Sequence, residues 1–342
     1  MKRILALMLS VLMVASLLAG CGQAAPVETE AKETAAPVAE TEAPAAVEST
    51  GVTVMNVFGE EEIEMTYEKA PERVVSLAGF ATEMMLALGL EDRLVGYAWQ
   101  DNEVLPQYAD AFAKLQPLCD PGMDPGEEKV LAAQPDLVIS WASWSDEEYF
   151  NYKNLAKNGI QAYGFHSERW SGGKLEDVYT DFLNMGKIFC VEDRAEALVN
   201  EMRTNIDAVA ARVADKEPVR VFVCDSSSTE ENTMTVAGGL PQEILEKAGG
   251  VNVYKDGNSN WARNVSWEII AAGNPEWIVI DVYASGEEAE PIIELLKNHP
   301  AMKNCDAVVN DQIVVVGLTD ISCSERIDET VELLASKFHP EA

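Results

Sequence analysis

The chain has 342 residues, of which 47% are hydrophobic, so it is long enough to form one large or two ordinary domains with well-packed cores. Its 58 acidic residues against 25 basic ones give a formal net charge of −33, which argues against nucleic acid and anionic lipid headgroups as partners of its surface. The cysteines show no CxxC spacing, so a structural zinc site or a thioredoxin-like redox site has little support.

The N-terminus has the pattern of an export signal. Lys2 and Arg3 precede an apolar run from Ile4 to Leu18, which is too short for a typical membrane-spanning helix. The small residues Ala19 and Gly20 then come directly before Cys21, as in bacterial lipoprotein signals. We therefore predict a signal peptide at 1–20 and lipidation of Cys21; the alternative is a plain secretory signal with an incidental cysteine.

A change in composition follows the predicted anchor. Between residues 22 and 50 the chain is rich in Ala, Glu, Thr, Pro and Val, and it contains no aromatic residue. Such a segment cannot bury enough apolar surface to form a core. We predict that residues 21–50 are a lipidated, disordered linker that holds the folded part at the outer face of the bacterial cell membrane.

Short apolar runs alternate with helical patterns over the next 120 residues. A small hairpin is predicted around Phe58, Gly59 and Glu60. Strands are predicted at 74–77, 94–97, 137–140 and 160–165, and helices at 82–88, 127–133 and 151–159. This alternation of helices and buried strands predicts an α/β lobe.

The longest periodic segment lies in the middle of the chain. From Asp193 to Ala214, apolar residues recur at steps of three and four, which predicts one helix of about 33 Å at 1.5 Å per residue. Asp193 is a candidate N-cap with Glu196 three residues later, and Pro218 follows the end. An ordinary amphipathic surface helix is the alternative to a helix that connects two lobes.

The segments on either side of this helix repeat each other. After it, strands are predicted at 219–224, 277–280 and 312–316, and helices at 241–249 and 327–338. Glu83 stands six residues before Gly89, as Glu243 does before Gly249. Pro135-Asp136 before a strand is matched by Pro275-Glu276 before another. We infer two similar lobes around one connecting helix.

At this point the sequence resembles the class III solute-binding lipoproteins of ABC importers for iron-siderophores, haem and cobalamin. The resemblance spans roughly residues 52–340. The matching landmarks are Pro71-Glu72-Arg73-Val74-Val75-Ser76-Leu77, Thr82-Glu83, Leu86-Ala87-Leu88-Gly89, Arg93-Leu94-Val95-Gly96, Gln134-Pro135-Asp136-Leu137-Val138-Ile139, Val265-Ser266-Trp267-Glu268 and Asn274-Pro275.

The resemblance implies two Rossmann-like α/β lobes joined by a single long backbone helix, with the ligand held between them. The corresponding boundaries are 51–173 for the N-terminal lobe, 174–217 for the connecting helical segment and 218–342 for the C-terminal lobe. It implies no catalysis, no cofactor and no metal ion of the protein's own. The expected partners are a metal chelate and an ABC permease with its cytoplasmic ATPase, and we expect a monomer that closes only slightly on its ligand.

The permease is expected to contact one glutamate on each lobe, Glu83 and Glu243. Helical geometry places each of them away from the apolar face of its helix, so we expect both to be exposed. A structural alternative is that each carboxylate only stabilises the first turn of its helix.

Residues that follow the predicted strands are candidates for the ligand site, because ligands of open α/β sheets bind beyond the carboxyl ends of the strands. Aromatic and basic residues gather there, as suits a large organic chelate. The candidates that follow strands are Phe80, Trp99, Trp141, Trp144, His166, Arg169, Trp170 and Tyr283. The predicted loop Asp256 to Asn264 adds Trp261 and Arg263, and Arg326 is a further basic candidate. In contrast, Trp267 and Trp277 lie inside predicted elements and are expected to pack in the core.

The cargo is left open among three chelates, with an iron-siderophore first, cobalamin or another corrinoid second and haem third. Capture of a bare metal ion is disfavoured because the chain has only three histidines, His166, His299 and His339. An extracytoplasmic enzyme is also disfavoured, because the sequence contains no GxSxG, HExxH or phosphate-binding loop.

Overall fold

The computed structural model describes residues 51–120, 123–141, 151–255, 259–283 and 289–341. The predicted signal, Cys21, the linker and Trp144 lie outside the described residues. The described residues all belong to one compact unit. No helix among the described residues is both long enough and apolar enough to cross a membrane.

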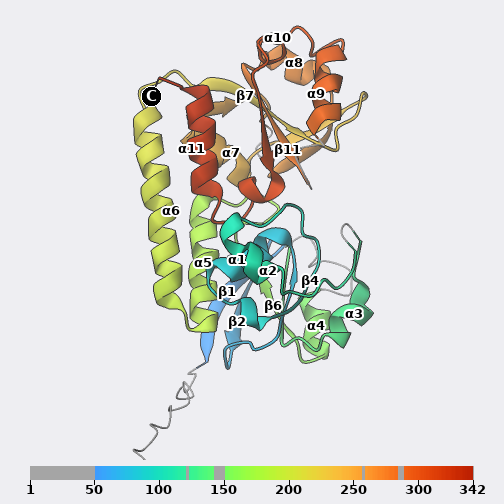
Figure 1. The fold of residues 1–342 in the computed structure, drawn as a ribbon, viewed down its shortest axis with the longest axis vertical. Helices are drawn as coiled ribbons and strands as arrows, with labels where there is room; N and C mark the ends of the chain where they lie inside the picture. The colour runs from blue at the N-terminus through green and yellow to red at the C-terminus, as the bar shows by residue number, and fades with distance from the viewer. Residues whose placement is uncertain (1–50, 121–122, 142–150, 256–258, 284–288, 342) are drawn as a thin grey trace, which may run out of the picture. The chain divides into compact units, whose positions relative to one another are not determined.

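The chain forms two parallel four-stranded sheets (Figure 1). The first has the order β4-β3-β5-β6, and the second has the order β12-β11-β7-β9. The strands of the first are β3 (Val74–Leu77), β4 (Leu94–Tyr97), β5 (Leu137–Ser140) and β6 (Gln161–Gly164). The strands of the second are β7 (Val219–Asp225), β9 (Gly250–Asn252), β11 (Trp277–Val282) and β12 (Ile313–Gly317).

Two antiparallel pairs accompany the sheets. The predicted hairpin is present as β1 (Val52–Phe58) and β2 (Glu61–Tyr67). The second pair, β8 (Thr233–Val236) with β10 (Trp261–Val265), is absent from the sequence-based prediction, which placed Trp261 and Arg263 in a loop. These two strands are separated by 24 residues, so no local turn signal marks their pairing.

Eleven α-helices connect the strands in the described ranges. Those of the first lobe are α1 (Gly79–Ala87), α2 (Ala109–Phe112), α3 (Gly126–Ala132) and α4 (Tyr152–Lys157). Those of the second are α7 (Gly239–Lys247), α8 (Trp267–Gly273), α9 (Ala289–Asn298), α10 (Asp306–Val309) and α11 (Ile327–Phe338). Between the lobes run α5 (Leu175–Phe189) and α6 (Glu192–Val213).

The predicted long helix is confirmed as α6, shifted by one residue. It packs against both α5 and α11, which lie side by side with it in Figure 1. Its predicted cap is wrong: the N-cap is Val191, without a side-chain bond, and Asp193 lies inside the first turn. The buried face comprises Ala195, Val199, Met202, Ile206, Val209 and Val213, and each fully buried Val, Ile or Met contributes about 1.5–3 kcal/mol.

One hydrophobic core continues through both lobes. It includes Val74 and Leu137 from the first sheet and Val221 and Val279 from the second, together with the buried face of α6. Smaller clusters cover the other face of each sheet. The expected core position of Trp267 is confirmed at 1% exposure, whereas Trp277 is half-buried and its ring lies near that of Phe338.

Candidate functional site

A cleft of about 360 Å³ lies at the carboxyl ends of strands from both sheets. Trp141 follows β5, the segment 168–170 follows β6, and Tyr283 and Leu318 follow β11 and β12. Trp261 and Arg263 reach it from β10. The complete set of lining residues is Trp141, Glu168, Arg169, Trp170, Met234, Ser259, Asn260, Trp261, Arg263, Tyr283 and Leu318. The cleft therefore brings together six of the eleven predicted ligand residues.

Trp141 is supported by an edge-to-face cluster of aromatic rings. The ring of Phe80 packs edge-on against Trp141 at 4.6 Å and against Phe165 at 5.0 Å. Phe80 itself is only 1% exposed. Phe80 is therefore not among the lining residues: it is the second residue of the buried helix α1 and supports the residue that lines the cleft.

His166 was another predicted contact, and the structure places its imidazole elsewhere. The residue is buried, and its Nε2 lies 2.7 Å from the carbonyl oxygen of Met55 in β1. Its backbone N–H donates to the buried carboxylate of Asp181 on α5. Because the imidazole is engaged within the first lobe, His166 is not a cleft residue.

Asp181 fixes the segment from which the next cleft residues project. Its carboxylate accepts hydrogen bonds from the hydroxyl of Tyr163 and from the N–H and hydroxyl of Ser167. Burial, followed by repulsion from Asp181, raises the pKa of the neighbouring Glu168 to about 8. Glu168 therefore keeps its proton to a higher pH than an ordinary glutamate does.

Two arginines supply positive charge at the cleft. Arg169 is tied to its own lobe, since its guanidinium lies 3.4 Å from Glu62 and 4.0 Å from Asp177. Arg263 is exposed and forms no ion pair with any residue of the described segments. Arg263 is thus the cation available to a carbonyl or carboxylate of a ligand.

Tyr283 lines the cleft above a buried acidic pair. Its hydroxyl donates to Asp225 Oδ2 at 2.7 Å, and Asp225 is the register partner of Asp281 on the adjacent strand. Both aspartates are fully buried. Burial is the main cause that raises the pKa of Tyr283 well above its usual range, so its hydroxyl stays protonated.

Arg326, the last basic candidate, does not line the cleft. Its guanidinium forms a bidentate ion pair with the carboxylate of Glu83 and also contacts the carboxylate of Asp320. The predicted exposure of Glu83 is wrong, because its side chain is 1% exposed. Eight of the nine residues of helix α1 are buried, so the helix has no solvent-exposed polar face. The prediction for Glu83 assumed such a face.

The remaining candidates lie outside the cleft or outside the described residues. Trp99 is half-buried and is not among the lining residues. Trp144 lies outside the described residues. Glu243 is half-buried rather than exposed, and its Oε2 accepts a hydrogen bond from the backbone of Leu175 at 2.9 Å.

The profile of the periplasmic binding protein family matches residues 74–317, which is more than half of the chain. The chain belongs to this family. The Vitamin B12-binding protein of Vibrio parahaemolyticus serotype O3:K6 is 27% identical over 218 residues, covering 64% of this chain and 73% of that protein. The corresponding protein of Yersinia pestis (strain Pestoides F) is 26% identical over 213 residues, covering 62% of this chain and 70% of that protein.

Solved structures agree with this assignment. A periplasmic binding protein from Veillonella parvula superposes with a TM-score of 0.78 at 27% identity, covering 85% of this chain and 99% of that one. The ABC-type Fe3+-hydroxamate transport system protein from Saccharomonospora viridis gives 0.70 at 22% identity, covering 85% and 100% of the two chains. At that lower identity the likeness shows the two-lobed fold alone.

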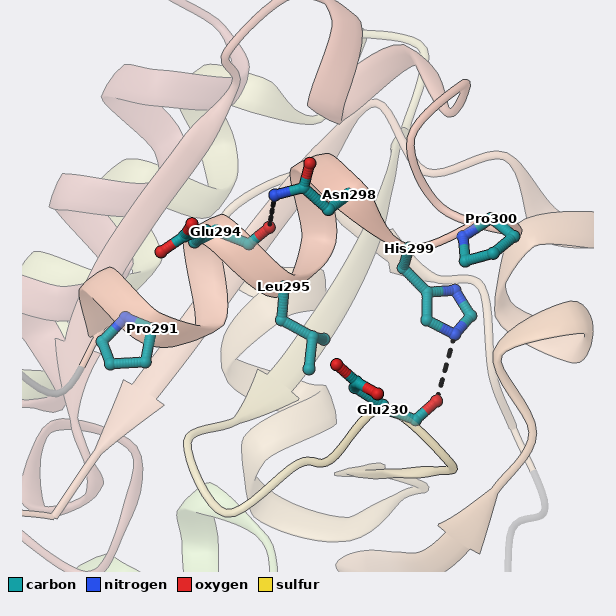
Figure 2. A pocket seen from close by; sticks show the side chains of 7 residues that line it. All are labelled: Glu230, Pro291, Glu294, Leu295, Asn298, His299 and Pro300. Atoms are coloured by element: carbon teal, nitrogen blue, oxygen red, sulfur yellow. Dashed lines mark hydrogen bonds between the residues drawn. The ribbon is translucent and has the colours of Figure 1, made fainter.

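A second hollow of this periplasmic binding protein lies between α9 and the loop that follows β7 (Figure 2). It measures about 610 Å³ and is lined by Glu230, Pro291, Glu294, Leu295, Asn298, His299 and Pro300. Its polar groups already bond to one another: His299 Nε2 lies 3.2 Å from the Glu230 carbonyl oxygen, and Asn298 donates to the Glu294 carbonyl. It has no tryptophan and draws on one lobe only, so it fits a large chelate less well than the cleft.

Sequence reasoning missed five lining residues. Glu168 and Leu318 directly follow predicted strands and were within reach of the same rule, but neither is aromatic or basic. Met234, Ser259 and Asn260 depend on the β8–β10 pairing, which has no local sequence signal. No group of three or more His, Cys, Asp or Glu side chains among the described residues is placed to hold a metal ion.

Proposed function

We propose that this protein is the extracytoplasmic solute-binding component of an ABC importer, and that it binds an organic metal chelate in the cleft between its lobes. One observation supports this above the others. Trp141, Trp170, Trp261 and Tyr283, from the strand ends of both lobes, line one cleft in a member of the periplasmic binding protein family. Large aromatic walls with a few polar groups are typical of sites for bulky organic ligands. Binding and delivery, rather than catalysis, follow from this reading.

The cargo belongs to the class of siderophore, corrinoid and haem chelates. The two curated relatives described above bind vitamin B12 by name, which makes cobalamin the first chelate to test, beside the iron-siderophore that the sequence analysis placed first. Arg263 can donate to a carbonyl or carboxylate of any of the three.

The remaining parts of the proposal concern the chain outside the cleft. Lipidation of Cys21 after removal of residues 1–20 would anchor the protein, and the linker to residue 50 would give it reach. The first parallel sheet lies within 51–173 and the second within 218–342, in support of the proposed lobe boundaries. Docking to a permease stays part of the proposal, but the buried Glu83 is not available as its contact.

The experiment is a fluorescence titration of the purified protein with cyanocobalamin, haemin and a ferric trihydroxamate. We expect one of them to bind, and the variants Trp141→Ala, Trp261→Ala and Arg263→Ala each to weaken that binding about tenfold or more. Trp277→Phe, far from the lining residues, is the matched control and should bind as the wild type does. Failure of all three compounds to bind would refute the proposal, as would unchanged affinity in all three cleft variants.

A further inference from the structure

One segment of the second lobe, Gly317 to Arg326, carries contacts to the first lobe and to α5. Thr319 donates from its backbone to Asn102, and the thiol of Cys323 lies 3.6 Å from Asp181. At its end, Arg326 pairs with Glu83. This contact segment therefore joins the lobes beside the cleft.

Asn102 has the most specific geometry on the segment. Its Nδ2 donates to the carbonyl oxygen of Val282 at 2.9 Å, and its Oδ1 accepts from the N–H of Thr319 at 2.9 Å. One side-chain amide from the first lobe thus bonds the last residue of β11 and the turn that follows β12 in the second lobe. Asn102 is 8% exposed, so both bonds are shielded from water.

The position of the Asn102 amide requires a glycine at residue 317. A Cβ at Gly317 would lie 2.8 Å from Cγ and Oδ1 of Asn102, closer than side-chain atoms approach one another. The absence of a side chain at 317 is what lets the amide reach both backbone groups.

The two backbone groups that Asn102 holds are next to cleft residues. Val282 precedes Tyr283, and Thr319 follows Leu318, and both Tyr283 and Leu318 line the cleft. The Glu83–Arg326 pair also links the lobes, but neither of its members lines the cleft. Of these two polar interlobe contacts, Asn102 is therefore the one that directly holds the backbone next to Tyr283 and Leu318, the wall that the second lobe contributes to the cleft.

We propose that Asn102 is a positioning residue for ligand binding: by bridging Val282 and Thr319 it holds the Tyr283–Leu318 wall against the first lobe before the ligand arrives. This inference rests on the proposed ligand-binding role of the cleft. A preformed wall avoids the loss of apparent affinity that arises when only a fraction of the protein is competent to bind.

The test uses Asn102→Ala, which removes both bonds, and Asn102→Asp, which has the same shape but cannot donate to Val282. The probe is whichever of cyanocobalamin, haemin and ferric trihydroxamate binds the wild type. We expect about tenfold weaker binding in Asn102→Ala through a slower association rate, with the dissociation rate changed less than about twofold. Asn102→Asp should show the same direction even if the alanine variant folds poorly.

Asn274→Ala is the matched control. Asn274 also uses both ends of its amide, donating to the Asp306 carboxylate and accepting from the Asp306 N–H, but within the second lobe and away from the cleft residues. It should lower stability without changing the association rate. Equal association rates in the wild type and in both Asn102 variants would overturn the inference while leaving the proposed function intact.

A measurement without ligand completes the test. In hydrogen exchange of the free protein, the Asn102 variants should speed exchange at the amides of 281–283 and 317–321 about tenfold, and Asn274→Ala should not. Unchanged exchange at these amides would overturn the inference whatever ligand the protein binds. If none of the three probes binds the wild type, the proposed function fails and exchange still decides whether Asn102 holds the wall.

Discussion

The Glu83 carboxylate and the Arg326 guanidinium form a buried ion pair between the two lobes. Glu83 also accepts the N–H of Leu105, and Arg326 also donates to the carbonyl of Glu103. These extra hydrogen bonds satisfy groups that burial would otherwise leave unpaired. Taking two charges out of water costs several kcal/mol, so such a pair is most sensitive to the loss of one partner.

Arg326→Met should therefore lower the free energy of unfolding by about 3–5 kcal/mol, because it leaves the Glu83 carboxylate buried without a counter-charge. Urea unfolding at pH 7 measures this. The control is Arg212→Met, which breaks an ion pair with Glu332 whose side chains are 37% and 51% exposed, and which should cost less than about 1 kcal/mol. Equal losses in the two variants would contradict this account of the buried pair.

The Asp225–Asp281 pair gives stability a pH dependence. Burial and the neighbouring Asp225 raise the pKa of Asp281 well above the usual range, and its carboxyl oxygens have no hydrogen-bond partner among the described residues. The folded state therefore holds a proton that the unfolded chain releases above about pH 3.9. Stability from this group is complete at low pH and falls as pH rises toward the raised value.

Asp281→Asn should remove this dependence, since an amide does not titrate. Relative to the wild type, the variant should gain stability progressively as the pH rises above about 4 toward the raised pKa of Asp281, by about 1.4 kcal/mol per pH unit. Unfolding midpoints measured across this range provide the check. A stability difference that does not grow with pH would show that Asp281 is ionised in the folded protein.

At the residue scale, the sequence predicts the chemical type of the site residues better than it predicts which of their side chains are exposed to the cleft. The rule that ligand residues follow parallel strands found Trp141, Arg169, Trp170 and Tyr283 in the cleft. It placed Phe80 and His166 there as well, but each of them finds a partner inside the protein that sequence spacing does not reveal. Which side chain points to the cleft is decided by contacts between distant segments.

At the element scale, α5 and α6 depend on close helix packing. A Cβ at Gly186 of α5 would lie 2.5 Å from the Cβ of Ala195 on α6, so a glycine facing an alanine lets the two helices approach. The turn between them includes Cys190, which has a positive φ of 56°. The rigid contact between α5 and α6 follows from these small residues.

Gly186→Val should destabilise the protein by about 1–3 kcal/mol through overpacking at this contact. Ala211→Val, at an exposed position of α6, should cost only the helix propensity difference of about 0.5 kcal/mol. Thermal unfolding of the two variants compares them directly. If the two substitutions cost the same, the close approach at Gly186 does not limit the packing of α5 against α6.

The helices and strands themselves were largely predictable, because the spacing of apolar residues and the Gly and Pro residues that end an element are local signals. Strands 74–77, 94–97 and 137–140 and helix 327–338 have the predicted bounds. The β8–β10 pair was missed because its register depends on segments that meet only in the folded lobe. That pair carries Trp261 and Arg263, so the error changed how two site residues are held but not where they lie.

At the scale of the whole molecule, a single core joins the two sheets, and Asn102 and the Glu83–Arg326 pair link the lobes beside and behind the cleft. The contacts favour a site that is largely formed before its ligand binds. They also fit the expectation of small closure. The central claim is that one ligand contacts both walls at once.

Hydrogen exchange of the protein with and without its bound chelate tests this claim most directly. We predict slower exchange on both sides of the cleft, in 163–170 of the first lobe and in 259–265 and 281–283 of the second, with little change at 291–300 beside the other hollow. Protection confined to one lobe, or centred on 291–300, would contradict the account.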